Sequence, residues 1–332
     1  MSSSTPLDSI EVVLADLDGV IYRGPGAIPY AVESINTLDP AIRVGYVTNN
    51  ASRTDATVAA HLTELGLSVA PNDVVTSPQA AVTLLTNLVP SGSTVLVVGG
   101  DGLTSEVERA GFTVTRSALD SPAAVIQGFD PSVGWLHLAE ACYALNDGGE
   151  AVHWVATNTD WTIPQARGIA PGNGTLVSAV HTAVGRLPVV AGKPEVAIFE
   201  EAFARFGSRA ALMIGDRLDT DILGANRAGI PSALVLTGID QAKQVLAAVP
   251  DQRPTYILED LRELHVPYPA AVVEEVPGGV DTVVRGARVR RVGHVLTVIS
   301  GDGVDLLRAG AVAIWDSGLA IYGLEVPAEL YS

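Results

Sequence analysis

The chain has 332 residues, of which 48% are hydrophobic and 17% charged, and its formal net charge is −17. This length suits two modest domains with a sizeable core, and so acidic a chain is a poor partner for nucleic acid or an anionic membrane. The single cysteine, Cys142, excludes an intrachain disulfide and fits a reducing compartment. The opening residues MSSSTPLDSI lack a basic or apolar leader, and no apolar run approaches the ~20 residues of a membrane span. We therefore expect a cytoplasmic protein.

Nine apolar runs are typical of strands, and several are apolar throughout, as in parallel strands covered on both faces. They lie at residues 11–16, 44–49, 94–100, 123–128, 151–158, 188–192, 210–216, 232–238 and 255–260. Helical patterns lie between them. Residues 195–206, for example, place four apolar side chains on one stripe: Val196, Phe199, Phe203 and Phe206. This alternation predicts an α/β fold with a Rossmann-like, doubly wound parallel core.

The character of the sequence changes after about Pro267. The stretches TVVRGARVRRV and HVLTVIS are typical of antiparallel strands, and VDLLRAGAVAIW is typical of a helix. We therefore expect a small α+β segment appended to the main fold, and we assign it no activity.

Two carboxylates, Asp16 and Asp18, end the first apolar run, and Gly19 follows at once. Ligands of parallel α/β sheets bind beyond the carboxyl ends of the strands, and residues i and i+2 of an extended segment point the same way. The pair therefore suits one site, where a hard cation such as Mg²⁺ relieves the repulsion or one carboxylate acts as a nucleophile. The alternative is an ordinary Asp-Gly turn.

A second acidic stretch, GDRLDTDI, follows the apolar run AALMI. Its first carboxylate, Asp216, sits at a strand end and should project toward the same edge as Asp16. Asp219 and Asp221 come just after it. An acidic helix N-terminus is the alternative and could by itself explain Asp219.

Two other strand ends carry polar groups. Lys193, one of only two lysines in the chain, follows a strand in AGKP, which lacks the residues of a phosphate-binding P-loop. Its alternative is a solvated surface lysine. Thr48, Asn49 and Asn50 follow another strand, where a hydroxyl and an amide could bind phosphate oxygens. The alternative is an ordinary helix cap at Ser52 or Thr54.

In this order, the four pieces resemble the motifs of the haloacid dehalogenase-like superfamily. DLDGV is similar to its first motif, Thr48 stands at the second, Lys193 at the third and GDRLDTDI at the fourth. The stretches YVTNNASRT, ATNTD, PGNGTLV, AGKP and GDRLDTDILGANRAGI resemble the subfamily of nitrophenylphosphatase, phosphoglycolate phosphatase and pyridoxal phosphatase. Within it, they are most similar to the actinobacterial glycerol-3-phosphate phosphatases. The resemblance runs from about residue 11 to residue 265.

The resemblance implies a Mg²⁺-dependent phosphatase that works through an aspartyl-phosphate. Asp16 would be the nucleophile and Asp18 the general acid and base. The metal would be held by Asp16, the backbone carbonyl of Asp18 and Asp216.

The resemblance also implies the groups that handle the phosphate. Thr48, the backbone of Asn49, Asn50 and Lys193 would bind it and stabilise its charge. Asp221 would orient Lys193 or a metal-bound water.

Motif spacing predicts an inserted domain. Only 30 positions separate Asp18 from Thr48, enough for one helix and one strand. The 145 positions from Thr48 to Lys193 exceed a crossover of about 30 residues by roughly a hundred. We therefore expect a discontinuous catalytic core at residues 1–78 and 186–266, a cap domain at 79–185 and the C-terminal segment at 267–332.

One loop of the expected cap, Asn158, Thr159 and Asp160, follows the strand at 151–158 and is our candidate for substrate contact. Its amide, hydroxyl and carboxylate suit the hydroxyls of a polyol. It offers no cation for a second anionic group unless Arg167 reaches in. The alternative is a plain Asx turn.

The expected substrate is a small phosphorylated metabolite, and the resemblance favours glycerol 3-phosphate. Phosphoglycolate, pyridoxal phosphate and nucleotides are the alternatives. Two alternatives come from other classes: a phosphate-ligand sensor without turnover, and a structural partner protein whose C-terminal segment carries the function. We expect no nucleic acid or membrane partner, and the sequence leaves a homodimer open.

Overall fold

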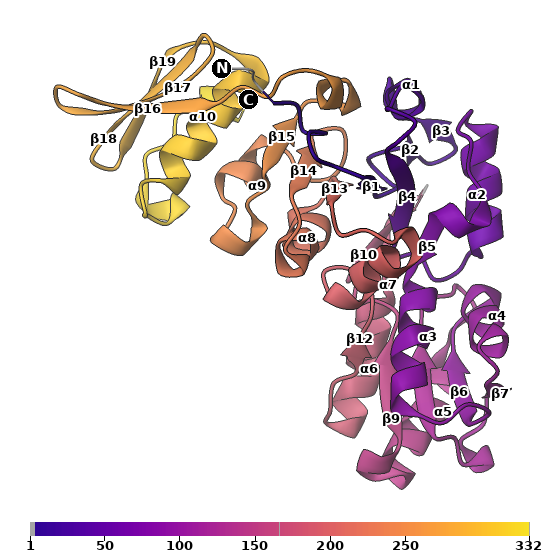
Figure 1. Ribbon diagram of the computed structural model, residues 1–332. Helices are drawn as coiled ribbons and strands as arrows, with labels where there is room; N and C mark the ends of the chain where they lie inside the picture. The colour runs from indigo at the N-terminus through magenta and orange to yellow at the C-terminus, as the bar shows by residue number, and fades with distance from the viewer. Residues whose placement is uncertain (1–3, 166, 332) are drawn as a thin grey trace. The chain divides into compact units, whose positions relative to one another are not determined.

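The computed structural model describes residues 4–165 and 167–331. The chain divides into two compact units, one of Met1–Arg43 with Arg209–Ser332 and one of Val44–Ser208 (Figure 1). The predicted boundaries between core, cap and C-terminal segment remain a prediction. Among the described residues, no helix has the length and apolar character needed to cross a membrane.

Four parallel strands form the centre of the first unit, in the order β15–β14–β13–β1. Their bounds are Val12–Ala15 (β1), Ala211–Gly215 (β13), Ser232–Val235 (β14) and Tyr256–Leu258 (β15). Every residue of β1, β13 and β14 is buried, which is why these strands are almost wholly apolar instead of alternating. The remaining elements of this part are α1 (Ala31–Asn36), α8 (Leu223–Ala228), α9 (Ala242–Leu246) and the hairpin of β2 (Tyr22–Arg23) and β3 (Gly26–Ala27).

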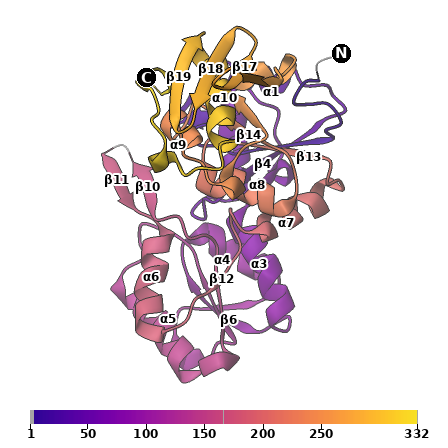
Figure 2. The same cartoon turned by 90° about the vertical axis from the view of Figure 1, so that its left-hand side faces the viewer.

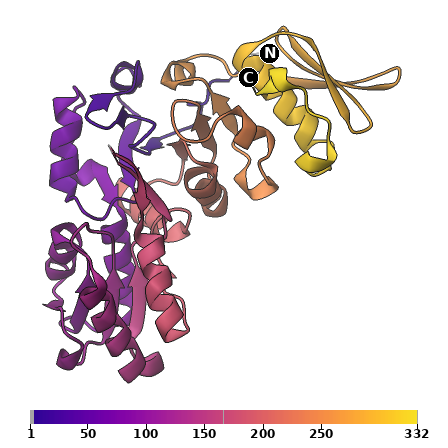
Figure 3. The same ribbon diagram turned by 180° about the vertical axis from the view of Figure 1, so that it is seen from behind.

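The C-terminal segment adds an antiparallel sheet and a helix to the first unit. The strands are β16 (Ala271–Val276), β17 (Gly279–Val284), β18 (Ala287–Val292) and β19 (Val295–Ser300). Helix α10 (Gly303–Trp315) lies along one face of this sheet (Figure 3). It shares one apolar cluster with α9 and β15. The C-terminal segment therefore contributes apolar side chains to the core of its unit.

The second unit begins with the parallel pair β4 (Arg43–Thr48) and β5 (Val74–Thr76). Helices α2 (Asp55–Glu64), α3 (Ser77–Leu88) and α7 (Val196–Phe206) pack against β5. Helix α7 buries Phe199, Phe203 and Phe206, three of the four side chains predicted to share its apolar stripe.

A separate sheet of five parallel strands completes the second unit, in the order β12–β9–β8–β6–β7. Helices α5 (Trp135–Asp147) and α6 (Asn173–Val184) cover one face, and α3 and α4 (Asp101–Arg109) cover the other (Figure 2). The strands are β6 (Thr94–Val98), β7 (Thr113–Thr115), β8 (Ala124–Gln127), β9 (His153–Ala156) and β12 (Val189–Val190), and a hairpin is formed by β10 (Thr162–Gln165) and β11 (Gly168–Pro171).

All nine predicted strands are present, and the parallel sheets with flanking helices confirm the predicted fold class. The strands that the sequence did not reveal are β5, β7, β16 and those of the two hairpins, most of them too short to show a periodic pattern. Short 3₁₀ helices lie at Pro71–Asp73, Ala118–Asp120, Gly149–Ala151, Pro250–Gln252, Leu261–His265, Ile321–Gly323 and Ala328–Leu330.

Candidate active site

Three carboxylates gather at the carboxyl end of the parallel strands in the first unit. Asp16 follows β1 and Asp216 follows β13, and because these strands are parallel neighbours their ends meet at one edge. Asp16, Asp216 and Asp221 each place an oxygen within 4.8 Å of the others. The prediction that Asp216 projects toward the edge of Asp16 is therefore confirmed.

A π-helical turn, Leu218–Ile222, brings Asp221 into this group. The Oδ2 of Asp221 accepts a hydrogen bond from the backbone N–H of Arg217 at 3.1 Å. Gly215 leaves room for the side chain of Asp221, because an ideal Cβ at position 215 would lie 2.1 Å from the Cβ of Asp221. The sequence predicted Asp221 to act through neighbouring groups, whereas the structure places its oxygen among the potential metal ligands.

Two other acidic residues lie outside the cluster of three. Asp219 is exposed, forms an ion pair with Arg217 at 2.8 Å and lies in the first turn of Leu218–Ile222, which agrees with the alternative of an acidic helix N-terminus. Asp18 is exposed, and its backbone forms an isolated bridge with Tyr22. Its role as general acid and base stays a prediction.

The three carboxylates fit a magnesium ion. Carboxylate oxygens are the ligands that this hard cation prefers, and Asp216 and Asp221 are only 2% and 1% exposed, where negative charge needs compensation. Gly19, with φ at +82° in the left-handed region, keeps the backbone close to Asp216. An ideal Cβ at this position would lie 2.2 Å from Oδ2 of Asp216.

The loop after β14 is a part of this site that sequence reasoning missed. The N–H of Ile239 donates to Oδ2 of Asp216 at 2.7 Å, and the N–H of Asp240 donates to the backbone oxygen of Asp216 at 3.0 Å. The pKa of the Asp240 carboxyl is raised above its usual value, mainly because the group is buried. The nearby carboxylate of Asp219 also raises this pKa, whereas the hydrogen bond from the N–H of Leu218 lowers it. A signal was available, because residues 232–238 were predicted as a strand and the residues after it share the ligand edge.

In the second unit, the structure brings Asn49 and Lys193 together. The side chain of Asn49 accepts from the N–H of Lys193 at 2.8 Å and donates to its carbonyl at 2.9 Å. Lys193 is buried, and its ammonium donates to the carbonyl of Val47 at 3.1 Å. The alternative of a solvated surface lysine is therefore wrong. Thr48 is buried at the end of β4, and its Oγ1 accepts from the N–H of Asn50 at 3.1 Å.

The loop after Asn49 contains an Asx turn and the N-cap of the next helix. The side chain of Asn50 accepts from the N–H and the hydroxyl of Ser52, at 2.9 and 2.8 Å. Thr54 is the N-cap of α2 and accepts from the N–H of Thr57 at 3.2 Å. The alternative of a helix cap is therefore borne out at Thr54, and phosphate binding by Asn50 stays a prediction.

The loop of Asn158, Thr159 and Asp160 forms the Asx turn that was the alternative to substrate contact. Oδ1 of Asn158 accepts from the N–H of Asp160 at 3.2 Å, and Nδ2 of Asn158 donates to the carbonyl of Asn49 at 2.7 Å. Asn158 is 3% exposed, and both of these hydrogen bonds are to backbone groups. The carboxylate of Asp160 accepts from Nδ2 of Asn49 at 3.1 Å, which connects this loop to the groups around Lys193.

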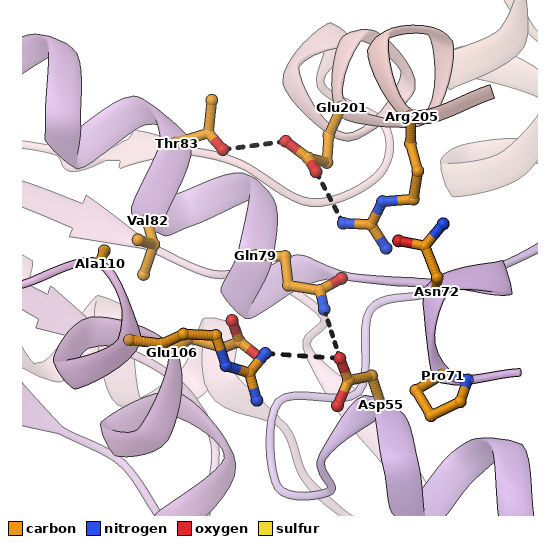
Figure 4. Close-up of a pocket in the computed structure, with 11 residues that line it drawn as sticks. Asp55, Pro71, Asn72, Gln79, Val82, Thr83, Glu106, Ala110, Glu201 and Arg205 are labelled. Atoms are coloured by element: carbon orange, nitrogen blue, oxygen red, sulfur yellow. Dashed lines mark hydrogen bonds and ion pairs between the residues drawn. The ribbon is translucent and has the colours of Figure 1, made fainter. Parts of the chain in front are cut away.

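A polar hollow of about 600 Å³ lies elsewhere in the second unit, between α2, α3, α4 and α7 (Figure 4). The carboxylate of Asp55 accepts from Gln79 and Arg109, at 3.1 and 3.4 Å. The carboxylate of Glu201 accepts from Arg205 at 2.6 Å. Because these charged groups are engaged with one another, we assign the hollow no ligand.

The fold and the carboxylate site agree with the comparison to known families. A family model described as haloacid dehalogenase-like hydrolase matches residues 13–113, and a second, described as HAD-hydrolase-like, matches residues 190–264. The chain belongs to the haloacid dehalogenase-like hydrolases.

Two relatives and one solved structure show which members of this family the chain resembles. The chain is 44% identical over 318 residues to a D-glycerol 3-phosphate phosphatase of Mycobacterium tuberculosis. This alignment covers 93% of this chain and 87% of the relative. The chain is also 33% identical over 258 residues to a 5'-nucleotidase of Bacillus subtilis. This alignment covers 77% of this chain and 97% of the relative. The crystal structure of a glycerol phosphate phosphatase from M. tuberculosis in complex with magnesium aligns with a TM-score of 0.83 at 41% identity, over 96% of this chain and 94% of that one.

Proposed function

We propose that this protein is a Mg²⁺-dependent phosphatase that hydrolyses glycerol 3-phosphate through an aspartyl-phosphate. The observation that carries the chemistry is the cluster of Asp16, Asp216 and Asp221 at the ends of two parallel strands. The substrate rests on the similarity to the mycobacterial glycerol phosphate phosphatases. The single cysteine, Cys142, fits the cytoplasmic location that we include in the proposal.

The reaction runs in two steps at phosphorus. A carboxylate oxygen of Asp16 bonds to phosphorus in line with the ester oxygen, whose bond to phosphorus breaks, and Asp18 gives its proton to the departing alkoxide. Asp18 then takes a proton from a water that attacks phosphorus, and the bond to Asp16 breaks to release phosphate. A Mg²⁺ ion held by Asp16, the backbone carbonyl of Asp18 and Asp216 would supply positive charge to the phosphate and reduce the repulsion between the phosphate and the carboxylate of Asp16.

The same proposal assigns the phosphate-binding residues and the cap. Thr48, the backbone of Asn49, Asn50 and Lys193 bind the phosphoryl oxygens and stabilise the charge that develops on them. Residues 79–185 form the cap domain that selects the substrate. Asp160 is the cap residue that we favour for contact with the glycerol hydroxyls.

The substrate is tested by measuring kcat/KM for glycerol 3-phosphate, phosphoglycolate, pyridoxal phosphate and a nucleoside 5'-phosphate with Mg²⁺. We expect glycerol 3-phosphate to be the best of the four. Trp161 is 66% exposed and is the aromatic side chain next to the candidate loop, so Trp161→Ala should affect pyridoxal phosphate more than glycerol 3-phosphate. A tenfold advantage for another ester, about 1.4 kcal/mol of discrimination, would overturn the substrate and leave the phosphatase standing.

The role of Asp160 has its own test. Asp160→Ala should lower kcat/KM for glycerol 3-phosphate more than for nitrophenyl phosphate, which has no hydroxyls to bind. Asp160→Asn retains an acceptor for Asn49 and separates that contact from the loss of charge. Asp147→Ala, at an exposed residue of α5, is the control. Equal losses for both substrates in Asp160→Ala would remove Asp160 from the proposal.

A further inference from the structure

One loop of the first unit makes hydrogen bonds to both chain segments that carry the acidic cluster. It consists of residues 237–240 and follows β14. Oγ1 of Thr237 donates to the carbonyl of Gly19 at 2.7 Å, in the segment that begins at Asp16. Ile239 donates to the side chain of Asp216 at 2.7 Å.

The same loop also holds the turn that carries Asp221. The N–H of Asp240 donates to the backbone oxygen of Asp216 at 3.0 Å, and the carboxylate of Asp240 accepts from the N–H of Leu218 at 2.7 Å. Leu218 is the first residue of the π-helical turn that contains Asp221. Residues 237–240 therefore form hydrogen bonds to the backbone of Gly19, Asp216 and Leu218 and to the carboxylate of Asp216.

We propose that Thr237, Gly238 and Asp240 are positioning residues, and that residues 237–240 form a clamp loop that sets the spacing of Asp16, Asp216 and Asp221 for the metal. The inference rests on the proposed Mg²⁺ site. Groups that orient metal ligands through hydrogen bonds contribute strongly to metal affinity, and their loss typically weakens binding about 10–100-fold.

Gly238 provides the steric part of the clamp. An ideal Cβ at Gly238 would lie 1.9 Å from Oδ2 and 2.2 Å from Cβ of Asp216. The φ of Gly238 is not in the left-handed region, so its backbone conformation does not require glycine. What excludes a larger residue is the side chain of Asp216. Any residue other than glycine must therefore displace a carboxylate of the cluster.

The test compares Thr237→Val, which is isosteric but lacks the hydroxyl, with Thr237→Ser, which keeps it. Gly238→Ala tests the steric contact, and Gly286→Ala, at a glycine of the same unit with open space around it, is the control. Mg²⁺ affinity is measured by titration calorimetry, and the melting temperature is measured separately without metal. Thr237→Val and Gly238→Ala should bind Mg²⁺ about 10–100-fold more weakly, while Thr237→Ser and Gly286→Ala should bind like the wild type.

The outcomes separate this inference from the function on which it rests. A wild-type protein that binds no Mg²⁺ overturns the proposed metal site itself. A wild type that binds, together with Thr237→Val and Gly238→Ala variants that bind equally well, overturns the clamp. Equal loss of affinity in Thr237→Val and Thr237→Ser also overturns it, because the hydroxyl would then not matter. If Gly238→Ala fails to fold, the threonine pair decides alone.

Discussion

Arg308 connects the C-terminal helix α10 to the parallel sheet of the first unit, and its replacement should destabilise the protein strongly. Its side chain is 3% exposed. The guanidinium donates to the carbonyl of Ile257 at 2.9 and 2.6 Å, to Glu263 at 2.8 Å and to Asp305 at 2.7 Å. It also lies over the ring of Tyr268, 4.7 Å from the centroid. Arg308→Met keeps much of the apolar stem and removes all of these polar contacts.

The magnitude follows from what the substitution leaves behind. Glu263 and Asp305 are 20% and 21% exposed, so water compensates them only in part, and the carbonyl of Ile257 loses both of its guanidinium donors. Removing one partner of a buried ion pair costs about 3–5 kcal/mol. At about 2 °C per kcal/mol for a large domain, the melting temperature should fall by about 6–10 °C.

The assay is a thermal melt of Arg308→Met beside a matched control, Arg285→Met. Arg285 pairs with the same carboxylate, Asp305, at 3.2 Å, but its side chain is 50% exposed. An exposed pair contributes about 0–1 kcal/mol, so the control should melt within about 2 °C of the wild type. A shift for Arg308→Met no larger than that for Arg285→Met would refute the reasoning.

Three further outcomes are expected. Asp16→Asn keeps the size of the side chain but removes the nucleophile, so turnover of nitrophenyl phosphate should vanish without a change in melting temperature; turnover within a few-fold of wild type would contradict the covalent step. Asp18→Asn should slow hydrolysis of an alkyl phosphate about 10²–10⁴-fold. Its effect on the first step with nitrophenyl phosphate should be smaller, because that leaving group needs little protonation, and equal losses in single turnover would argue against the role. Hydrogen bonds from Arg290 and then Arg288 hold the pKa of Asp281 below its usual range. This interaction stabilises the folded state above the unfolded carboxyl pKa of about 3.9, and the contribution is lost as pH falls through the folded pKa. Asp281→Asn should therefore lower the melting temperature near neutral pH, and the difference should narrow below about pH 4; a difference that is constant across this range would count against the ion pair.

The positions of the candidate site residues along the chain could be predicted from the apolar runs of the sequence. A strand buried on both faces must be apolar at consecutive positions, so its end is marked by the first polar side chain. This reasoning placed Asp16 directly after β1, Thr48 at the last position of β4 and Asp216 directly after β13. Because the carboxyl ends of neighbouring parallel strands meet at one edge, the meeting of Asp16 and Asp216 followed from the same pattern.

The contacts that hold these residues in place could not be predicted from the sequence. Thr237 and Gly19 are 218 positions apart, and Arg308 and Ile257 are 51 apart, yet each pair is joined by a hydrogen bond. Asn158 uses its amide for a turn and for a hydrogen bond to the backbone of Asn49. Hydrophobic periodicity reports which face of an element is buried, because burial is a property of the element itself. The partner of a single polar side chain depends on where the rest of the chain passes, and that path leaves no periodic pattern in the sequence.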